Sequence, residues 1–242
     1  MGLKVGIYGF GAIGRLLAKT ALERGHEIVG VVDIDPSLVG RDAGEAIGVG
    51  NIGVEGSKDP LSLIESDVVL HATGSYLDKV YPQIAALVDM GLDVVSTCET
   101  LAYPYYRYPM LARRLEDLAL RRGVTVIGTG INPGFLLDTL IIALSAPFNV
   151  VKSIRAVRSV DAAKRREPFR KKIGVGEDPR VVEEKLRRGE ITGHVGYAES
   201  VLLIAEAADL VLSKVVEGQE VVPADRDVES HGIRVPSGRN LG

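Results

Sequence analysis

The sequence is poor in cysteine and has no tryptophan: one Cys and no Trp occur among 242 residues. A single cysteine excludes an internal disulfide framework and favours a reducing compartment. No charge of one sign dominates either, because 29 Lys and Arg stand against 32 Asp and Glu, for a formal net charge of −3. This balance gives no electrostatic case for nucleic acid or an anionic membrane as a main partner.

Long apolar runs are also missing. No stretch approaches the roughly 20 apolar residues that a membrane-spanning helix needs. The first residues run straight into a strand pattern and do not resemble a signal peptide. With 46% hydrophobic and 25% charged residues, the composition is that of a globular protein with a sizeable core. We therefore expect a cytoplasmic protein with no membrane partner.

Glycine, in contrast, is abundant, with 28 of 242 residues, where about 7% is usual. Short apolar, β-branched runs alternate with helical patterns over the first half of the chain, which predicts a parallel sheet covered on both faces. The expected strands are Lys4–Tyr8, Glu27–Val32, Asp67–Ala72, Asp93–Thr97 and Val124–Gly128, and the expected helices are Ala12–Arg24, Leu77–Met90 and Met110–Arg122.

The rhythm changes after Pro133 and Gly134. Helices are predicted at Phe135–Ser145, Asp178–Arg188 and Tyr197–Leu212, and an alternating strand at Val150–Asp161. The basic stretch Lys164–Lys172 is predicted to be a solvated loop or arm. Residues 229–242 resemble strand and loop material that stops within an element. The predicted fold is thus α/β: a doubly wound parallel Rossmann sheet in residues 1–133, and a smaller, incomplete α+β domain in residues 134–242.

The first glycines form the pattern G-x-G-x-x-G between a strand and a helix. Gly9 permits the tight turn, Gly11 allows a pyrophosphate to approach the backbone, and Gly14 allows close packing of helix on strand. The free N–H groups of the helix start then face the phosphates. The intervening residues of this predicted dinucleotide site are Phe10, Ala12 and Ile13.

Asp33 ends the next predicted strand, about 20 residues further on, where an acidic side chain accepts hydrogen bonds from the ribose hydroxyls. Its carboxylate would repel a 2′-phosphate, which favours NAD over NADP. Arg41 and Lys58 in the following loops leave NADP open. The expected cofactor is NAD or NADP, with NAD preferred.

Further candidates follow the other strands, whose carboxyl ends line the ligand crevice of such sheets. The small residues Ala72, Thr73 and Gly74 leave room for the nicotinamide ribose, although an ordinary loop that caps a helix explains them equally well. Asn132, in a rigid turn rich in Gly and Pro, is placed to bind the nicotinamide carboxamide.

Glu99 follows a buried strand and would stand near the nicotinamide ring, unless it is only a helix cap or a surface charge. The neighbouring Cys98 is more typical of a buried small side chain than of a nucleophile. Tyr103 opens a cluster of four tyrosines that lines a substrate pocket, forms a dimer contact or packs under a helix. Phe135 is expected to face the substrate.

Four segments together resemble a known family: VVSTCETLAYP (Val94–Pro104), GTGINPGFLLD (Gly128–Asp138), KIGVG (Lys172–Gly176) and GHVGYAES (Gly193–Ser200). They are similar to 2,4-diaminopentanoate dehydrogenase and the native amine dehydrogenases, within the dihydrodipicolinate-reductase-like group. The resemblance implies NAD(P)-dependent oxidative deamination of a small amine or diamine to a ketone and ammonia, or the reverse reductive amination. It further implies Glu99 as the acid–base group, Phe135 as a pocket residue and a homodimer. Family chains are longer than this one.

Other assignments stay open. His194 lies between glycines and either reaches the substrate or stabilises a hinge. Arg155 and Arg158 are candidates for holding a substrate carboxylate or are plain exposed charges. No metal site is expected. A dihydrodipicolinate-reductase-type imine reductase is the alternative enzyme, although its His-His-Lys-rich stretch is not visible in residues 150–200. A non-catalytic NAD(P)-binding sensor is the alternative outside enzymes.

Overall fold

The structure, a computed structural model, describes residues 2–165, 167–191 and 193–242. The chain divides into two compact units, which we describe separately. The first combines Met1–Ala146 with Glu199–Val211, and the second combines Pro147–Ala198 with Leu212–Gly242. The first unit therefore includes most of a helix from later in the chain, within Glu199–Val211. The boundary expected between residues 133 and 134 stays a prediction.

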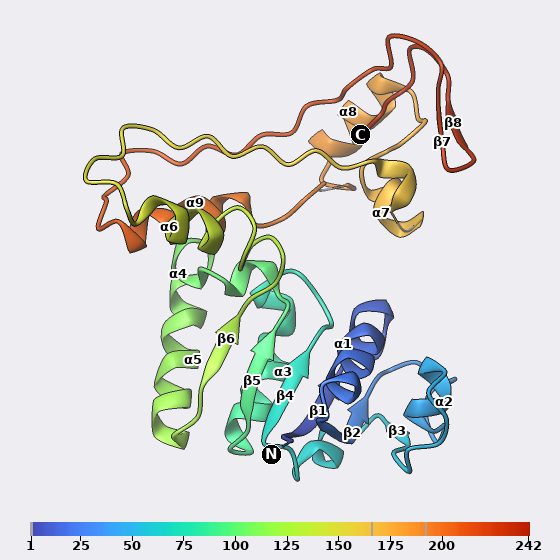
Figure 1. The fold of residues 1–242 in the computed structure, drawn as a ribbon, viewed down its shortest axis with the longest axis vertical. Coiled ribbons are helices and arrows are strands. Elements are labelled where there is room, and N and C mark those ends of the chain that lie inside the picture. Colours follow the sequence, from blue (N-terminus) through green and yellow to red (C-terminus); the bar gives the residue numbers. More distant parts are fainter. Residues whose placement is uncertain (1, 166, 192) are drawn as a thin grey trace. The chain divides into compact units, whose positions relative to one another are not determined.

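The first unit is built on a six-stranded, all-parallel sheet of order β3-β2-β1-β4-β5-β6 (Figure 1). The order reverses between β1 and β4, which is the topological switch point of a doubly wound sheet. The predicted α/β Rossmann fold is therefore confirmed. The strands are β1 (Lys4–Tyr8), β2 (Glu27–Val32), β3 (Gly56–Ser57), β4 (Val68–His71), β5 (Asp93–Ser96) and β6 (Val126–Gly128).

Two buried apolar clusters cover the two faces of this sheet. One joins β1 and β2 to α1 and α2, around side chains such as Ile7 and Ala18. The other joins β4 and β5 to α3 and α5, around Val69, Ile84 and Leu115. The helices of this unit are α1 (Ala12–Glu23), α2 (Ala43–Ile47), α3 (Leu77–Asp89), α4 (Pro104–Arg107), α5 (Pro109–Arg122), α6 (Thr139–Ser145) and most of α9 (Tyr197–Ala207), with short 3-10 turns η1 (Pro60–Leu63) and η2 (Glu99–Leu101).

Sequence and structure agree closely in this unit because the local signals and the packing point the same way. The α5 helix ends at Gly123, whose left-handed φ of 68° is the ordinary glycine stop. Two later helices are shorter than expected. The carboxylate of Asp138 caps α6, so that this helix starts at Thr139 and not at Phe135, and α9 ends at Ala207 and not at Leu212. No helix among the described residues is long and apolar enough to cross a membrane.

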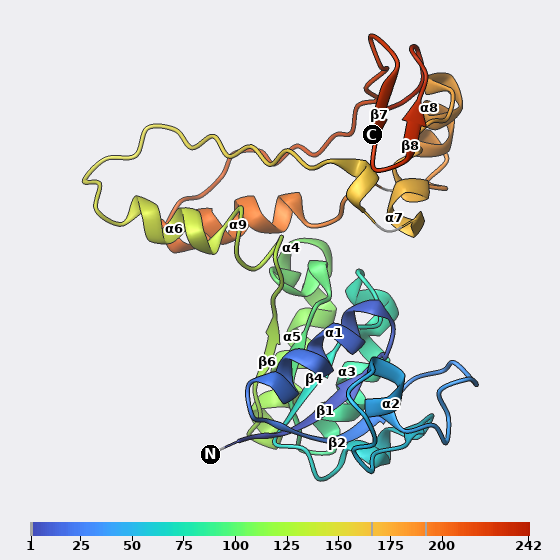
Figure 2. The ribbon, with the colours of Figure 1, turned by 45° about the vertical axis from the view of Figure 1, so that its right-hand side comes forward.

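The second unit contains α7 (Glu167–Lys172), α8 (Pro179–Arg187), the 3-10 turn η3 (Ala162–Lys164) and the antiparallel hairpin of β7 (Val228–Ser230) and β8 (Ile233–Val235). Figures 1 and 2 both show the hairpin next to α8. The second unit is smaller than the first and mixes helix with strand, as expected for an α+β domain.

Two predictions for this unit are wrong. Residues 150–161 form no strand: they run as extended chain, with Val150 73% and Val157 76% exposed. Alternation marks the faces of a strand, but a strand also needs a neighbour for its N–H and C=O groups, and no described segment pairs with this one. The basic stretch Lys164–Lys172 is not a loop but ends in helix α7; Arg166 within it lies outside the described residues.

Candidate active site

The predicted site residues of the first unit gather at one edge of the sheet. Beyond the strands, the parallel pairing continues for one more residue, because each strand-end residue donates its N–H to a carbonyl of the neighbouring strand. The donors are Gly9, Asp33, Ala72, Thr97 and Thr129, with N···O distances of 2.8–2.9 Å. The carboxyl ends of all these strands therefore lie side by side, where ligands of doubly wound folds bind.

The three glycines of the turn differ in what surrounds them. Gly9 has a φ of +92°, and a Cβ there would lie 2.7 Å from the carbonyl oxygen of Ala72. A Cβ on Gly14 would lie 1.8 Å from the carbonyl oxygen of Gly9, so that the helix packs directly on the turn. A Cβ on Gly11 would meet nothing within 4 Å. The turn therefore has two glycines fixed by packing and one that opens onto free space, as a cradle for a pyrophosphate requires.

The residues between these glycines take two different positions. Phe10 is buried, at 1% exposure, so only its backbone can face a ligand at this turn. Ala12 and Ile13 start α1 and are exposed. The helix has Gly11 as its N-cap and no side chain that caps it. A phosphate fits these residues, because the N–H groups of an uncapped helix start favour an anion.

Asp33 closes the turn from the next strand. Its carboxylate accepts the N–H of Phe10 at 2.5 Å and the N–H of Asp35 at 2.9 Å. The side chain is half-buried, so its position at the end of β2 is fixed while part of it remains accessible. Arg15, which sequence reasoning missed, braces the same turn through a hydrogen bond of 3.1 Å from Nε to the carbonyl of Phe10.

At the end of β4, Thr73 is exposed beside the glycine turn, with its neighbours Ala72 and Gly74 half-buried. Behind Thr73 lies a buried polar group that the sequence did not reveal. His71 has 0% exposure, and its ring is hydrogen-bonded to Ser96, Gln83 and Thr73. Burial lowers the pKa of His71 and the bond to Gln83 opposes that shift without cancelling it.

Glu99 is the first residue of η2, three residues after Ser96 at the carboxyl end of β5. Its side chain is half-buried. Among the described residues no hydrogen bond or ion pair engages its carboxylate. A carboxylate at the ligand edge of the sheet that has no partner among the described residues suits a bound cation.

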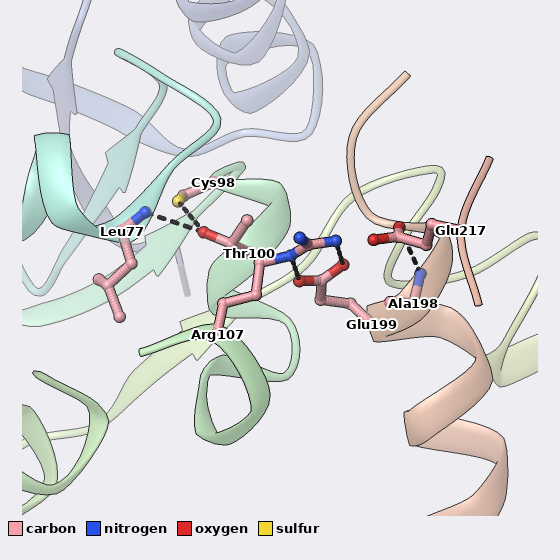
Figure 3. Close-up of polar contacts among 7 residues, drawn as sticks. All are labelled: Leu77, Cys98, Thr100, Arg107, Ala198, Glu199 and Glu217. Carbon is pink, nitrogen blue, oxygen red and sulfur yellow. Dashed lines mark hydrogen bonds and ion pairs between the residues drawn. The ribbon is translucent and has the colours of Figure 1, made fainter. Parts of the chain in front are cut away.

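The residues on either side of Glu99 are firmly held (Figure 3). Thr100 is fully buried; its hydroxyl accepts the N–H of Leu77 at 2.8 Å and its own N–H donates to the carbonyl of Ser75 at 3.1 Å. Cys98 is 1% exposed, and burial raises the pKa of its thiol. A buried thiol kept protonated is a packing residue, in line with the favoured interpretation of the sequence.

Farther along, helix α9 contacts α4 through an ion pair of Glu199 with Arg107 (Figure 3). The carboxylate of Glu199, which has no solvent exposure, pairs with the guanidinium of Arg107 through both its oxygens, at 2.5 and 3.5 Å. Tyr103 donates its hydroxyl to Glu206 at 3.1 Å. Tyr103 was predicted near the substrate; its hydroxyl is used here to bind α9, and Arg107 and Glu199 were not anticipated.

The remaining candidates are spread more widely. Asn132 is buried, at 6% exposure, and its side-chain oxygen accepts a hydrogen bond of 3.4 Å from Ser200, which also donates to Asp138 at 2.8 Å. Phe135 is 49% exposed. His194 belongs to the second unit, where its ring lies 4.7 Å from that of Tyr197. Its approach to the residues of the first unit stays a prediction.

No group of three or more His, Cys, Asp or Glu side chains in the described part of the chain has the arrangement of a metal site. The donor set at the strand ends is instead one of backbone N–H groups, small residues and single carboxylates, which suits a dinucleotide and a small cationic ligand.

Comparisons with known proteins fit this geometry. Residues 3–98 match the family model of the dihydrodipicolinate reductase N-terminus, and residues 135–242 match that of the 2,4-diaminopentanoate dehydrogenase C-terminal domain. The chain is 32% identical over 235 residues to 2,4-diaminopentanoate dehydrogenase of Acetoanaerobium sticklandii, covering 94% of this chain and 66% of that protein. The chain thus spans slightly less than two thirds of the length of this curated relative.

A shorter match, 38% identity over 85 residues, relates the chain to 4-hydroxy-tetrahydrodipicolinate reductase of Archaeoglobus fulgidus, covering 35% of this chain and 31% of that protein. Among solved structures, an amine dehydrogenase from Mycobacterium smegmatis superposes with a TM-score of 0.85 at 24% identity, over 100% of this chain and 73% of that one. At that identity, the superposition establishes the fold.

The class of protein follows first: the chain has the NAD(P)-binding fold of the dihydrodipicolinate-reductase-like dehydrogenases. Two observations identify the family within that class. The dihydrodipicolinate reductase N-terminal model is followed along the chain by the 2,4-diaminopentanoate dehydrogenase C-terminal model, and the sequence identity to 2,4-diaminopentanoate dehydrogenase extends over nearly the whole chain. The chain belongs to the 2,4-diaminopentanoate dehydrogenase family.

Proposed function

We propose that this chain catalyses the NAD-dependent oxidative deamination of a small amine or diamine to a ketone and ammonia, and the reverse reductive amination. The observation that carries the proposal is the carboxylate of Glu99, which follows β5 at the ligand edge of the sheet and has no partner among the described residues. Support comes from the amine-oxidising relatives named above.

The cofactor would be held by the residues of the glycine turn. Gly11 and the start of α1 fit a pyrophosphate, Asp33 fits the ribose hydroxyls, and the strand-end residues Thr73 and Gly74 would adjoin the nicotinamide half. Asn132 would bind the carboxamide from its buried position. A bound nicotinamide dinucleotide supplies the acceptor for the hydride of the substrate.

Glu99 has two tasks in this reaction. A hydride leaves a carbon that bears nitrogen only when the nitrogen offers a lone pair, so the substrate ammonium must first give up a proton, and the Glu99 carboxylate accepts it. Glu99 then passes this proton to solvent, and its carboxylate, ionised again, stabilises the cationic iminium that the substrate carbon and nitrogen form when the hydride leaves. Water adds to the iminium carbon, and Glu99 moves one of the water protons to the nitrogen. The carbon–nitrogen bond then breaks, which releases ammonia and a proton and leaves the ketone.

Asp33 supports NAD as the preferred cofactor. The carboxylate is held by two backbone N–H groups at the end of β2, where a 2′-phosphate would stand next to its negative charge. The partners are therefore a small amine or ketone, ammonia and NAD. Tyr103, Phe135 and His194 as pocket residues, a homodimer and a cytoplasmic location stay predictions.

The direct test follows the absorbance of reduced cofactor at 340 nm while the protein is mixed with NAD and a panel of amines that includes 2,4-diaminopentanoate. We expect reduction with at least one amine. Binding of NAD without reduction by any amine would favour a non-catalytic sensor, and oxidation of NADPH by a cyclic imine alone would favour an imine reductase.

A single variant tests the role of Glu99. Glu99→Gln keeps the shape of the side chain but cannot accept a proton, so we expect turnover to fall at least about 100-fold, the usual weight of a general base, while NADH titration shows unchanged binding. Glu116→Gln, on the exposed surface of α5, is the matched control. Near-normal turnover of Glu99→Gln would refute the assignment.

A further inference from the structure

The mechanism above leaves several buried titratable side chains unused, among them Asp138, Glu199 and His71. His71 is the last residue of β4, next to the strand ends that carry Gly9 and Glu99, and its side chain has no solvent exposure. Both ring nitrogens are hydrogen-bonded: Nδ1 lies 2.8 Å from the hydroxyl of Ser96, and Nε2 lies 2.9 Å from the side-chain oxygen of Gln83. A buried imidazole with both nitrogens hydrogen-bonded holds its partners in fixed positions.

The chemistry of the partners fixes the direction of these bonds. The oxygen of Gln83 only accepts, so Nε2 carries the ring proton and Nδ1 accepts the hydroxyl proton of Ser96. The lowered pKa of His71, caused by burial, keeps the ring neutral in this single tautomer around neutral pH.

The series of hydrogen bonds through His71 ends on two different loops. On one side, the hydroxyl of Ser96 accepts the N–H of Cys98 at 3.1 Å, which is the residue directly before Glu99. On the other side, the hydroxyl of Thr73 donates to Gln83 at 2.6 Å and lies 2.9 Å from Nε2 of His71. The methyl group of Thr73 faces the glycine turn, 2.8 Å from where a Cβ on Gly9 would lie.

We propose that His71 is a positioning residue that links the loop of Thr73, on the dinucleotide side, to the loop of Glu99, on the substrate side, through one hydrogen-bonded chain. This inference rests on the proposed function, which gives the two loops their tasks. A fixed spacing of the two loops matters because a displacement of about 1 Å at a reacting centre costs up to roughly 100-fold in rate.

Two substitutions of His71 separate its two sides. In His71→Asn the amide oxygen replaces Nδ1 and keeps the bond to Ser96, but the bond from residue 71 to Gln83 is lost. In His71→Gln the amide replaces Nε2 and the bond to Ser96 is lost. We expect His71→Asn to act mainly on the dissociation constant of NADH, raising it about fivefold, the value of one hydrogen bond. We expect His71→Gln to act mainly on kcat with the amine, lowering it about tenfold.

Gln83 provides a second route if the variants at the buried ring fail to fold, since its side chain on α3 is only half-buried. Gln83→Leu removes the acceptor for His71 and Thr73, so the dissociation constant of NADH rises as in His71→Asn. Gln83→Glu keeps an acceptor oxygen and is expected to restore the affinity. Melting temperatures measured in parallel report any general loss of structure.

The two sides of His71 also distinguish this inference from the proposed function. If His71→Asn and His71→Gln alter NADH affinity and kcat alike, in step with their melting temperatures, the ring is a packing residue and the inference is wrong. If the wild-type protein oxidises no amine, the proposed function fails, and NADH titration still decides: equal affinities for His71→Asn, Gln83→Leu and Gln83→Glu would overturn the positioning role.

Discussion

At the scale of single residues, the charge of Asp33 is expected to decide between the two nicotinamide dinucleotides. The N–H groups of Phe10 and Asp35 donate to different oxygens of Asp33. Asp33→Asn therefore keeps one of these two acceptors, and it removes the negative charge that a 2′-phosphate would meet. We expect the ratio of kcat/KM for NADP to that for NAD to rise at least about tenfold, equivalent to roughly 1.4 kcal/mol of relieved repulsion.

Asp35→Asn is the matched control for this prediction. Asp35 lies two residues away, is exposed, and uses its carboxylate to accept the N–H of Ser37. The same loss of charge there should change the cofactor ratio far less, because the ribose is expected at Asp33. An equal change in both variants would indicate a general electrostatic effect of the loop and would contradict a specific role for Asp33.

The sequence predicts those site residues whose pattern lies within one short segment. The glycine turn and Glu99 are each recognisable from nearby residues, since the turn directly follows one apolar strand and Glu99 comes three residues after another. His71 and Ser96 are 25 residues apart and meet only because β4 and β5 pair with these two residues as partners. Nothing in either local sequence encodes that pairing, and the sequence therefore did not reveal the network.

At the scale of elements, the turn between β1 and α1 separates glycines needed for packing from a glycine needed for ligand access. Gly14→Ala would place a Cβ 1.8 Å from the carbonyl oxygen of Gly9, so α1 must shift away from the sheet, and we expect a loss of at least about 2 kcal/mol in the free energy of unfolding. Gly11→Ala meets open space at an ordinary negative φ.

We therefore expect the melting temperature of Gly11→Ala to stay close to wild type while its dissociation constant for NADH rises at least about tenfold, because the new methyl group fills the place of the pyrophosphate. Thermal unfolding and NADH titration of the two variants check both halves. Unchanged NADH affinity in Gly11→Ala would show that the free space at this position does not hold the cofactor.

The elements that sequence reasoning missed share a physical cause. Helix α2 and strand β3 are only 5 and 2 residues long, too short for a hydrophobic period to register. Residues 150–161 show the opposite failure, because their alternation is clear but no described segment completes the pairing. In the parallel sheet, by contrast, β1, β4 and β5 are followed in the sequence by α1, α3 and α5, which pack into the buried apolar clusters, so local pattern and tertiary packing agree.

At the scale of the whole molecule, the two units are built differently. The first has a sheet with an apolar cluster on each face. The second, in its described residues, has three short helical segments and a two-stranded hairpin. Local stability follows buried apolar contact and backbone hydrogen bonding, so the first unit is expected to be the more resistant part of the chain.

Limited proteolysis tests this difference. Residues 147–160 carry Lys152 and Arg155, both exposed in extended chain, and no hydrogen bond joins the backbone of this described segment to another. A protease needs an accessible extended segment, so we expect trypsin to cut here, or at exposed Lys214, before it cuts at Arg121 in helix α5. Intact-mass spectrometry of a digestion time course identifies the first products. First cleavage within α5 would contradict the expected order of stability. In our proposal NADH binds the first unit, so saturating NADH should slow the later cuts in that unit without protecting Lys152.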